Sequence, residues 1–551
     1  MSKENSKSEI RHATGKSAQA ENPKLKETDT AQIARSAGSV SVAVFASRIL
    51  GLIREQVLAG LFGAGYFIDA YVVAFRIPNL LRDLFAEGAL SSAFVTVFTD
   101  YDQKKGPKET WRLANNVLTA LFIIVGALTL IGMFFAGDII MLMAPDFSRI
   151  PGKIALTWDM TVIMFPFFIL VSLAAAVMGM LNTKGYFFIP AMSSAFFNLG
   201  SIVSGVILAF VFPRFGQPAI VGMAVGTLIG GFLQLAIQLP SLHRVGFHLN
   251  PLLSFRDEGL RRVIKLMIPA IIGLSATQIN IFINTYFAAS CEQGSVSWLN
   301  YAFRLMQFPI GVFGVAISIA TLPVVSRHAS NKDLAQLKGA YLSALVMAFA
   351  LTIPASCGLI ILAKPIIGLI FEHGRFTGYD TLRTAEALSF YAIGLFAYAA
   401  VKIIVPVFYA LDDTKYPVIA SFMAVAVNIL VVTLTINHFQ HKAIAFSTSI
   451  TMIMNFVFLS LILYRKVEGY ALGYLFKSLA RVLMASAAMG LIVYYVHGWL
   501  EGIWGHGLHA ELFSLSITIA LAGLSYCFLL YALRLKEWRV LVEKFVKRVK
   551  I

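Results

Sequence analysis

Apolar residues in this chain fall in long runs that are separated by short polar segments. A helix needs about 20 predominantly apolar residues to cross the hydrocarbon core of a bilayer. The sequence of 551 residues contains fourteen runs of this kind, and each predicts a transmembrane helix. The predicted helices lie near residues 40–62, 67–99, 113–143, 158–182, 187–212, 217–240, 264–290, 295–326, 337–371, 381–410, 416–436, 443–464, 478–497 and 511–533.

Composition agrees with this pattern. Hydrophobic residues make up 58% of the chain and charged residues 13%, and the mean hydropathy is +0.76. These values lie far outside the range of soluble domains, so we predict an all-α polytopic membrane protein. Residues 1–38 are polar and lack the apolar core of a signal peptide. We interpret them as a disordered cytoplasmic tail, which leaves insertion to the first helix.

Basic residues are distributed unevenly along the predicted topology. The net charge is +16, which in a soluble protein would suggest a nucleic-acid partner. Here Lys and Arg concentrate on alternate connecting segments, such as "YDQKKGPKETWR" and the C-terminal "RLKEWRVLVEKFVKRVKI". Cytoplasmic loops carry such an excess, so both termini are predicted to be cytoplasmic. The charge therefore requires no nucleic acid.

Familiar catalytic and metal-binding motifs are missing from the sequence. The three cysteines, Cys291, Cys357 and Cys527, have no CxxC or metal-ligand spacing. The sequence contains no P-loop, GxSxG or HExxH motif. We therefore predict a protein that is not an enzyme and that has neither a cofactor nor a metal site.

Cations within the predicted helices need an explanation, because one at mid-membrane costs about 3 kcal/mol or more. Lys364 and Arg481 lie where they could reach a headgroup region. The clustering of arginines with Glu55, Asp69 and Glu87 on two short segments instead favours a water-filled cavity. Guanidinium is the donor best suited to phosphate and pyrophosphate. The eight cations are Arg48, Arg54, Arg76, Arg82, Arg304, Lys364, Lys402 and Arg481.

An internal repeat relates the two halves of the chain. "YVVAFRIPNLLRDLF" (71–85) is similar to "WLNYAFRLMQFPIGVF" (298–313), and the AFR triplets are 228 residues apart. "LNTKGYFFIPA" (181–191), followed by Asn198, matches "LDDTKYPVIA" (411–420), followed by Asn428. Six predicted helices separate the copies, so the repeat is parallel. We predict six-helix lobes at 39–255 and 256–466, and two further helices with a basic tail at 467–551.

Four stretches resemble the signature sequences of the MurJ/MviN lipid II flippases, within the multidrug/oligosaccharidyl-lipid/polysaccharide exporter superfamily. They are "SRILGLIRE", "FGAGYFIDAYVVAFRIPNLLRDLFAEGALSSAFV", "GSVSWLNYAFRLMQFPIGVFGVAISIATLP" and "FEHGRFTGYDT". The resemblance implies a bacterial inner-membrane transporter. It would move lipid II, the undecaprenyl-pyrophosphate-linked peptidoglycan precursor, to the periplasmic leaflet by alternating access. Membrane lipids and cell-wall synthesis proteins would be its other partners.

The resemblance also implies roles for individual residues. Arg48, Arg54, Arg82 and Arg304 match arginines that line the central cavity of the family, and the last two helices match a groove for the lipid tail. Asp69 matches an acidic residue near the outer side. The supporting cavity and gate positions are Ser47, Glu55, Asp69, Arg76 and Glu87.

One part of the family pattern is altered here. Some members have carboxylates, linked to sodium binding, where this chain has Asn284 and Val432. Hard cations prefer carboxylate and carbonyl oxygens, so the positions Asn284, Asn428, Val432 and Thr448 are expected to form only a degenerate sodium site.

Three other functions share some of these features. They are an exporter of another polyprenyl-linked glycan, a drug or cation antiporter, and a membrane glycosyltransferase. An antiporter for cations would need acidic cavity walls, whereas these walls are rich in arginine. A glycosyltransferase would need a catalytic acid on an outer loop, and "VHGWLEGIWGHGLHAE" offers only Glu501, Glu511 and histidines without metal spacing.

Overall fold

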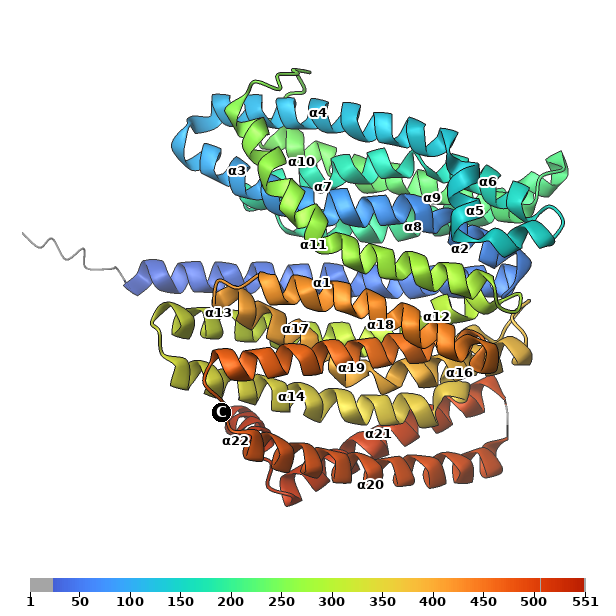
Figure 1. Cartoon of the computed structure of the whole chain (residues 1–551), viewed down its shortest axis with the longest axis vertical. Coiled ribbons are helices and arrows are strands. Elements are labelled where there is room, and N and C mark those ends of the chain that lie inside the picture. Colours follow the sequence, from blue (N-terminus) through green and yellow to red (C-terminus); the bar gives the residue numbers. More distant parts are fainter. Residues whose placement is uncertain (1–22, 506, 550–551) are drawn as a thin grey trace, which may run out of the picture.

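The computed structural model describes residues 23–505 and 507–549. Every regular element in these residues is a helix. The long helices run roughly side by side, in two stacked bundles with a smaller C-terminal group below them (Figure 1). This arrangement confirms the predicted all-α membrane fold.

Eleven helices in the described residues are long and apolar enough to cross a membrane, or twelve if a bent pair counts as one span. Two of the predicted spans are not among them, namely Pro23–Phe62 and the continuous helical stretch Tyr66–Lys104. These two segments carry most of the charges that we singled out. The count of fourteen crossings therefore stays a prediction.

The N-terminal lobe begins with α1, which starts at Pro23 and so includes part of the segment predicted as a tail. Residues 1–22 of that predicted tail lie outside the described residues. The elements of this lobe are α1 (Pro23–Phe62), α2 (Tyr66–Arg82), η1 (Asp83–Leu90), α3 (Ser91–Lys104), α4 (Gly106–Phe134), α5 (Ala136–Met143), η2 (Pro145–Arg149), α6 (Lys153–Met164), α7 (Phe167–Thr183), α8 (Phe188–Val211), η3 (Phe212–Phe215), α9 (Ala219–Ala236) and α10 (Leu239–Arg244).

The C-terminal lobe repeats this arrangement, and a third group of helices follows it. The basic tail contains the amphipathic helix α22, whose Trp538 lines a small apolar pocket together with α14 residues. The elements are α11 (Glu258–Ala289), α12 (Ser295–Pro309), η4 (Ile310–Val315), α13 (Ala316–Ser330), α14 (Leu334–Ile361), α15 (Ala363–Phe371), α16 (Gly378–Ile393), α17 (Leu395–Ala410), α18 (Lys415–Phe439) and α19 (His441–Lys466), then α20 (Leu472–Trp504), α21 (Leu508–Ala532) and α22 (Lys536–Val549).

The repeat is visible in the backbone of the second helix of each lobe. Arg76 on α2 is followed by Pro78 and then by the π-helix η1, and Arg304 on α12 is followed by Pro309 and then by the π-helix η4. Proline removes a hydrogen-bond donor, and π-helical turns often mark functional sites. The two AFR triplets therefore precede the same local irregularity in both lobes.

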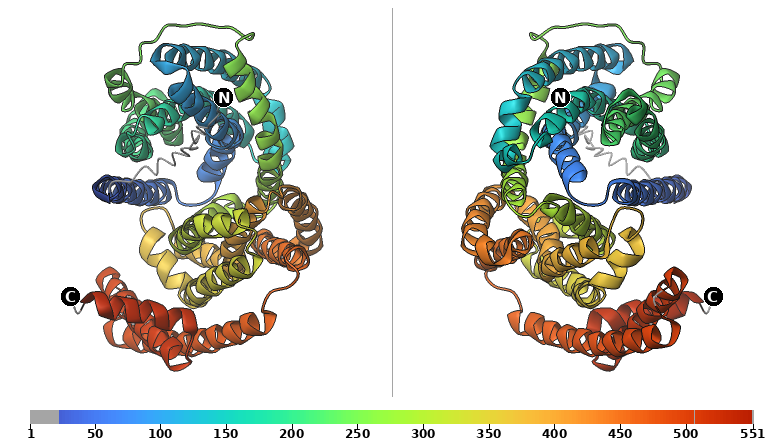
Figure 2. Two further views of the ribbon diagram at one scale, coloured as in Figure 1. Left: turned by 90° about the vertical axis from the view of Figure 1, so that its left-hand side faces the viewer. Right: turned by 90° about the vertical axis from the view of Figure 1, so that its right-hand side faces the viewer.

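Close packing inside a lobe depends on small residues. In α9, a Cβ atom built on Gly226 would lie 2.5 Å from Cα of Gly205 in α8, so the two backbones touch. In a lipid bilayer the hydrophobic effect does not drive helices together. Small residues at such crossings instead allow close van der Waals packing of the two backbones. The end views in Figure 2 show the two lobes as separate rings of helices. Helix α11 contains Pro269, and it packs against both lobes, on η1 and α3 of the N-terminal lobe and on α18 of the C-terminal lobe.

Candidate functional site

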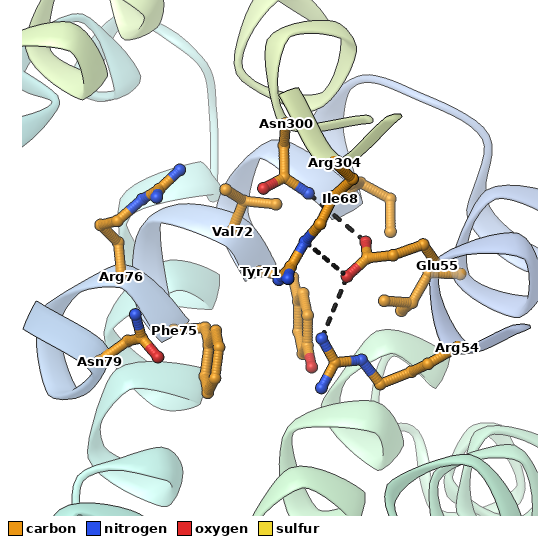
Figure 3. Close-up of a pocket in the computed structure, with 11 residues that line it drawn as sticks. Arg54, Glu55, Ile68, Tyr71, Val72, Phe75, Arg76, Asn79, Asn300 and Arg304 are labelled. Atoms are coloured by element: carbon orange, nitrogen blue, oxygen red, sulfur yellow. Dashed lines mark hydrogen bonds and ion pairs between the residues drawn. The ribbon is translucent and has the colours of Figure 1, made fainter. Parts of the chain in front are cut away.

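A small pocket of about 50 Å³ lies where the first two helices meet the C-terminal lobe. Helices α1 and α2 supply most of its wall, and α12 supplies the remainder. Figure 3 shows that the charged side chains gather on one side of Tyr71, with Arg76 on the other. The lining residues are Arg54, Glu55, Leu58, Ile68, Tyr71, Val72, Phe75, Arg76, Asn79, Asn300 and Arg304.

Glu55 is the centre of an ion-pair network that joins the lobes. Its Oε1 lies 3.0 Å from Nη2 of Arg54 and 3.4 Å from Nε of Arg304. Its Oε2 accepts a hydrogen bond of 3.4 Å from Asn300 (Figure 3). Glu55 is only 4% exposed, so both of its oxygens need such partners. The guanidinium of Arg54 also lies 5.3 Å from the ring centre of Phe197.

Arg76 differs from the other two pocket arginines, because it has no ion-pair partner among the described residues. Its Nε is buried and makes no hydrogen bond. Three arginines and one glutamate line the pocket, so its formal charge is +2. The site is therefore suited to an anion that carries about two negative charges.

Arg48 and Arg82, the other two predicted cavity arginines, lie outside this pocket lining. Arg82 pairs with Asp83, with Nε at 3.1 Å and Nη2 at 2.8 Å from Oδ1. The guanidinium of Arg48 rests against Gly311 in η4, in the space that a Cβ atom at residue 311 would occupy. Arg48 thus reaches from α1 to the C-terminal lobe.

Asp69 does not line the pocket. It forms a buried contact between the lobes with Lys153, Gly294 and Ser297, which we call the Asp69 joint. Asp69 is 1% exposed and pairs with Lys153 of α6, with Oδ2 3.1 Å from Nζ. It also accepts hydrogen bonds from the amides of Gly294 (2.8 Å) and Ser297 (3.0 Å) and from the Ser297 hydroxyl (2.6 Å), at the start of α12. A carboxylate at a helix N-terminus satisfies otherwise unpaired amides.

Sequence reasoning did not find Lys153 or Ser297. Lys153 lies between the predicted helices 113–143 and 158–182, and its side chain is 1% exposed. A signal for Ser297 existed, since Asp69 and Ser297 are 228 residues apart, the same offset as the AFR triplets. Residues at equal positions in the repeat thus meet across the lobe boundary.

Further contacts hold the lobes together near this joint. The amide of Arg375 donates to the carbonyl of Gly60 at 2.9 Å, and the side-chain amide of Gln56 donates to the carbonyl of Ile370 at 3.0 Å. The contacts join the end of α1 to the end of α15 and to the segment that follows it.

Ser47 and Glu87 are the remaining supporting positions. The carbonyl of Ser47 accepts a hydrogen bond of 3.2 Å from the side chain of Asn198 on α8. Glu87 lies in η1, and its side chain is outside the described part of the structure.

Three of the four degenerate sodium-site positions form a chain of neutral side chains. Asn284 accepts from Asn428 at 2.8 Å and donates to the Thr448 hydroxyl at 3.3 Å. The Ser447 hydroxyl donates to the other end, at Oδ1 of Asn428. Val432 is fully buried one turn further along α18. In the described residues no group of three or more His, Cys, Asp or Glu side chains could hold a metal ion.

Comparison with known families gives a clear assignment. The family model described as "Lipid II flippase MurJ" matches residues 58–515, which is most of the chain. The protein belongs to the MurJ family. This assignment confirms the resemblance found in the sequence, and it identifies the chain as a multi-pass membrane protein of a transporter family.

Individual MurJ proteins are similar over most of their length. A probable lipid II flippase MurJ of Buchnera aphidicola (strain APS) is 35% identical over 499 residues, covering 90% of this chain and 97% of its own. Lipid II flippase MurJ of Burkholderia cenocepacia is 36% identical over 404 residues, covering 73% of this chain and 77% of its own.

Solved structures give the same picture. A structure of lipid II flippase MurJ in an inward closed conformation has a TM-score of 0.74 and 28% identity, and it covers 90% of this chain and 99% of its own. An inward-facing multidrug transporter of the MATE family has a TM-score of 0.67 at 13% identity, covering 77% of this chain and 94% of its own, which shows a shared fold alone.

Proposed function

We propose that this protein is a flippase that moves lipid II from the cytoplasmic to the periplasmic leaflet of the bacterial inner membrane. The observation that carries the proposal is the pocket between the lobes, which has a formal charge of +2 and an arginine without an acidic partner in the described residues. The names of the MurJ relatives support the choice of substrate.

The negative charge of the lipid II pyrophosphate complements the positive charge of this pocket. A diphosphate headgroup loses its hydration when it leaves the membrane surface, and guanidinium groups can replace that hydration with paired, charge-assisted hydrogen bonds. A cationic drug would instead be repelled by the three arginines. The protein would act as a carrier and would break no bond in its substrate.

Transport by alternating access follows from the parallel repeat. Two lobes that rock around a central site can expose it first to one side and then to the other. The joint at Asp69 would then be broken when the site opens to the periplasm. The substrate must be bound about equally in both states, because strong preference for one state would trap it.

The lipid tail would stay in the membrane while the headgroup crosses. We assign the tail to a groove formed by the C-terminal segment 467–551, where α20 packs on α14 and α21 packs on α20. Both termini would lie in the cytoplasm, as the positive charge of the corresponding segments favours. Cell-wall synthesis proteins would be the natural partners at the membrane.

The central test concerns Arg48, Arg54, Arg82 and Arg304 as a pyrophosphate clamp. Each is replaced by Ala and by Lys in a strain depleted of its own flippase, and lipid II is measured in each leaflet. Ala at Arg54 or Arg304, which line the pocket, should abolish or greatly reduce translocation at normal membrane abundance, because each loss removes a charge-assisted contact of about 1.5–3 kcal/mol. For Arg48 and Arg82, which lie outside this pocket lining, we expect the same loss because they would meet the headgroup in another state of the transport cycle. Lys should rescue only partly, because it lacks the planar fork.

Lys364→Ala is the matched control, since Lys364 lies in α15, is exposed and does not line the pocket. It should leave translocation intact. Normal translocation by all four Ala variants would disprove the clamp. If lipid II changed chemically in the membrane but stayed in one leaflet, the protein would be an enzyme and not a flippase.

A further inference from the structure

The two sides of the pocket are not electrically equal. On one side Glu55 lies within ion-pair distance of both Arg54 and Arg304, so one carboxylate neutralises part of the charge of two guanidiniums. On the other side Arg76 has no ion pair among the described residues, and its buried Nε has no hydrogen-bond partner. The buried Nε of Arg54 also lacks a hydrogen bond, so the two sides differ in their ion pairs. An arginine that lines a pocket without a counter-ion is costly, and an anionic ligand that pairs with it removes that cost.

The surroundings of Arg76 also offer neutral donors. Asn79 lies three residues later on α2, and both side chains line the pocket on the same side of Phe75 (Figure 3). The Asn79 side-chain nitrogen makes only a long contact, 3.4 Å, with Asp83. Tyr71 is a poorer candidate as a donor, because its hydroxyl already forms a 2.7 Å hydrogen bond with Thr227. The side of the pocket near Arg76 thus combines one unpaired cation with one weakly engaged amide.

We propose that Arg76 is the residue by which this pocket distinguishes a diphosphate headgroup from a monophosphate. One phosphate binds at Arg54 and Arg304, where Glu55 limits the net positive charge, and the second binds at Arg76 and Asn79. This inference rests on the proposed function, because it takes a polyprenyl-linked phosphate as the ligand.

The repeat gives a physical reason for the arrangement. Arg76 and Arg304 are the AFR arginines of the two lobes, so a ligand between the lobes meets one from each side. Only Arg304 faces Glu55. The arginines around Glu55 are sufficient to bind a monophosphate. The second phosphate of a diphosphate adds negative charge that must be paired with Arg76 on the other side of the pocket. Discrimination therefore depends on the arginine without a carboxylate partner.

The test measures binding of two lipids to the purified full-length protein in detergent. The probes are undecaprenyl pyrophosphate and undecaprenyl phosphate, which differ by one phosphate. The unmodified protein should prefer the pyrophosphate by about tenfold, the effect of one charge-assisted contact. Arg76→Gln should reduce that preference to about onefold, and it should weaken the monophosphate by less than about threefold. Arg76→Lys should retain an intermediate preference.

Lys364→Gln is the control, since it removes an exposed cation of α15 that does not line the pocket, and it should keep the full preference. Thermal unfolding verifies that each variant is folded. If Arg76→Gln is unstable, the preference is measured with Arg76→Lys in its place. A full preference in folded Arg76→Gln, or in Arg76→Lys when Gln does not fold, would overturn this inference alone. Failure of the unmodified protein to bind either lipid or lipid II would instead overturn the proposed function.

Discussion

The first helix of each lobe crosses a partner helix at a related place, but the chemistry of the two crossings differs. In the C-terminal lobe, α11 and α18 are joined by a direct bond between the amides of Asn284 and Asn428. In the N-terminal lobe, Asn198 of α8 bonds to the backbone of α1, at the carbonyl of Ser47, and its side chain lies beside Gly51. One crossing is built from side chains and the other from a side chain and backbone.

This difference shows how a repeat can become asymmetric without changing its fold. The N-terminal crossing uses only a backbone carbonyl of α1, so the α1 side chains remain available for other contacts. Arg54 and Glu55, one turn after Gly51, line the pocket. At the C-terminal crossing, neutral side chains form a series of hydrogen bonds that ends at Thr448 on one side and at Ser447 on the other. Of the six Asp, Glu, Lys and Arg side chains that are buried in the described residues, three belong to the first two helices, namely Arg54, Glu55 and Asp69.

The largest effect on stability should come from removing the negative charge of Asp69. Asp69→Ala leaves Lys153 buried without a counter-ion and unpairs two amides of α12, so we expect a loss of about 3–5 kcal/mol in stability. Ser297→Ala, at the matching position of the repeat, removes only one hydroxyl and should cost about 1 kcal/mol. Thermal unfolding in detergent compares the two variants.

The same comparison has an internal check. Asp69→Asn combined with Lys153→Met removes both charges together, and it should be more stable than either single variant. If Asp69→Ala and Ser297→Ala had equal effects, the charge at the joint would contribute nothing. The asymmetry between the lobes would then lie elsewhere.

A smaller effect is expected from adding charge to the C-terminal lobe. Asn284→Asp with Val432→Asp places two carboxylates beside Asn428 and Thr448, so the altered protein should become more stable in sodium chloride than in potassium chloride. The expected gain is about 1–3 kcal/mol at sodium concentrations well above the dissociation constant. Thermal unfolding in the two salts measures it.

Asn198→Asp in the N-terminal lobe is the matched control and should show no sodium dependence, because its neighbours are one backbone carbonyl and Gly51. Sodium-dependent stability or transport in the unmodified protein would show that the neutral site already binds the ion. The premise of a degenerate site would then fail.

The smallest effect on stability should follow from a change at the contact between α1 and η4. Gly311→Ala puts a methyl group where the Arg48 guanidinium now lies. The end of a long side chain can move, so stability should change by less than about 0.5 kcal/mol. Translocation of lipid II should nevertheless fall, because Arg48 is displaced from its place against the C-terminal lobe.

Gly314→Ala, in the same π-helix, is the control for this prediction. A Cβ atom there would lie 3.1 Å from Cα of Ala399 and does not meet Arg48. It should change stability more than Gly311→Ala and translocation less. The reverse order would show that the contact of Arg48 with η4 has no role in transport.

The sequence by itself determined the membrane fold, the approximate position of the long helices, the repeat and the family. These features depend on local or nearly local information, such as runs of apolar residues, prolines and matching motifs. Pro78 and the repeated AFR triplet, which mark the irregular second helices, are both present in the local sequence. A helix satisfies its own backbone hydrogen bonds in a bilayer, whatever its neighbours are.

The tertiary structure alone decided which charges meet. Asp69 pairs with Lys153, 84 residues away, and Glu55 pairs with Arg304 of the other lobe. No spacing along the chain predicts these pairs, because they depend on how distant helices cross and where each side chain becomes buried. The same crossings leave Arg76 without a carboxylate among the described residues, because the only acidic side chain that lines the pocket is already shared by two other arginines.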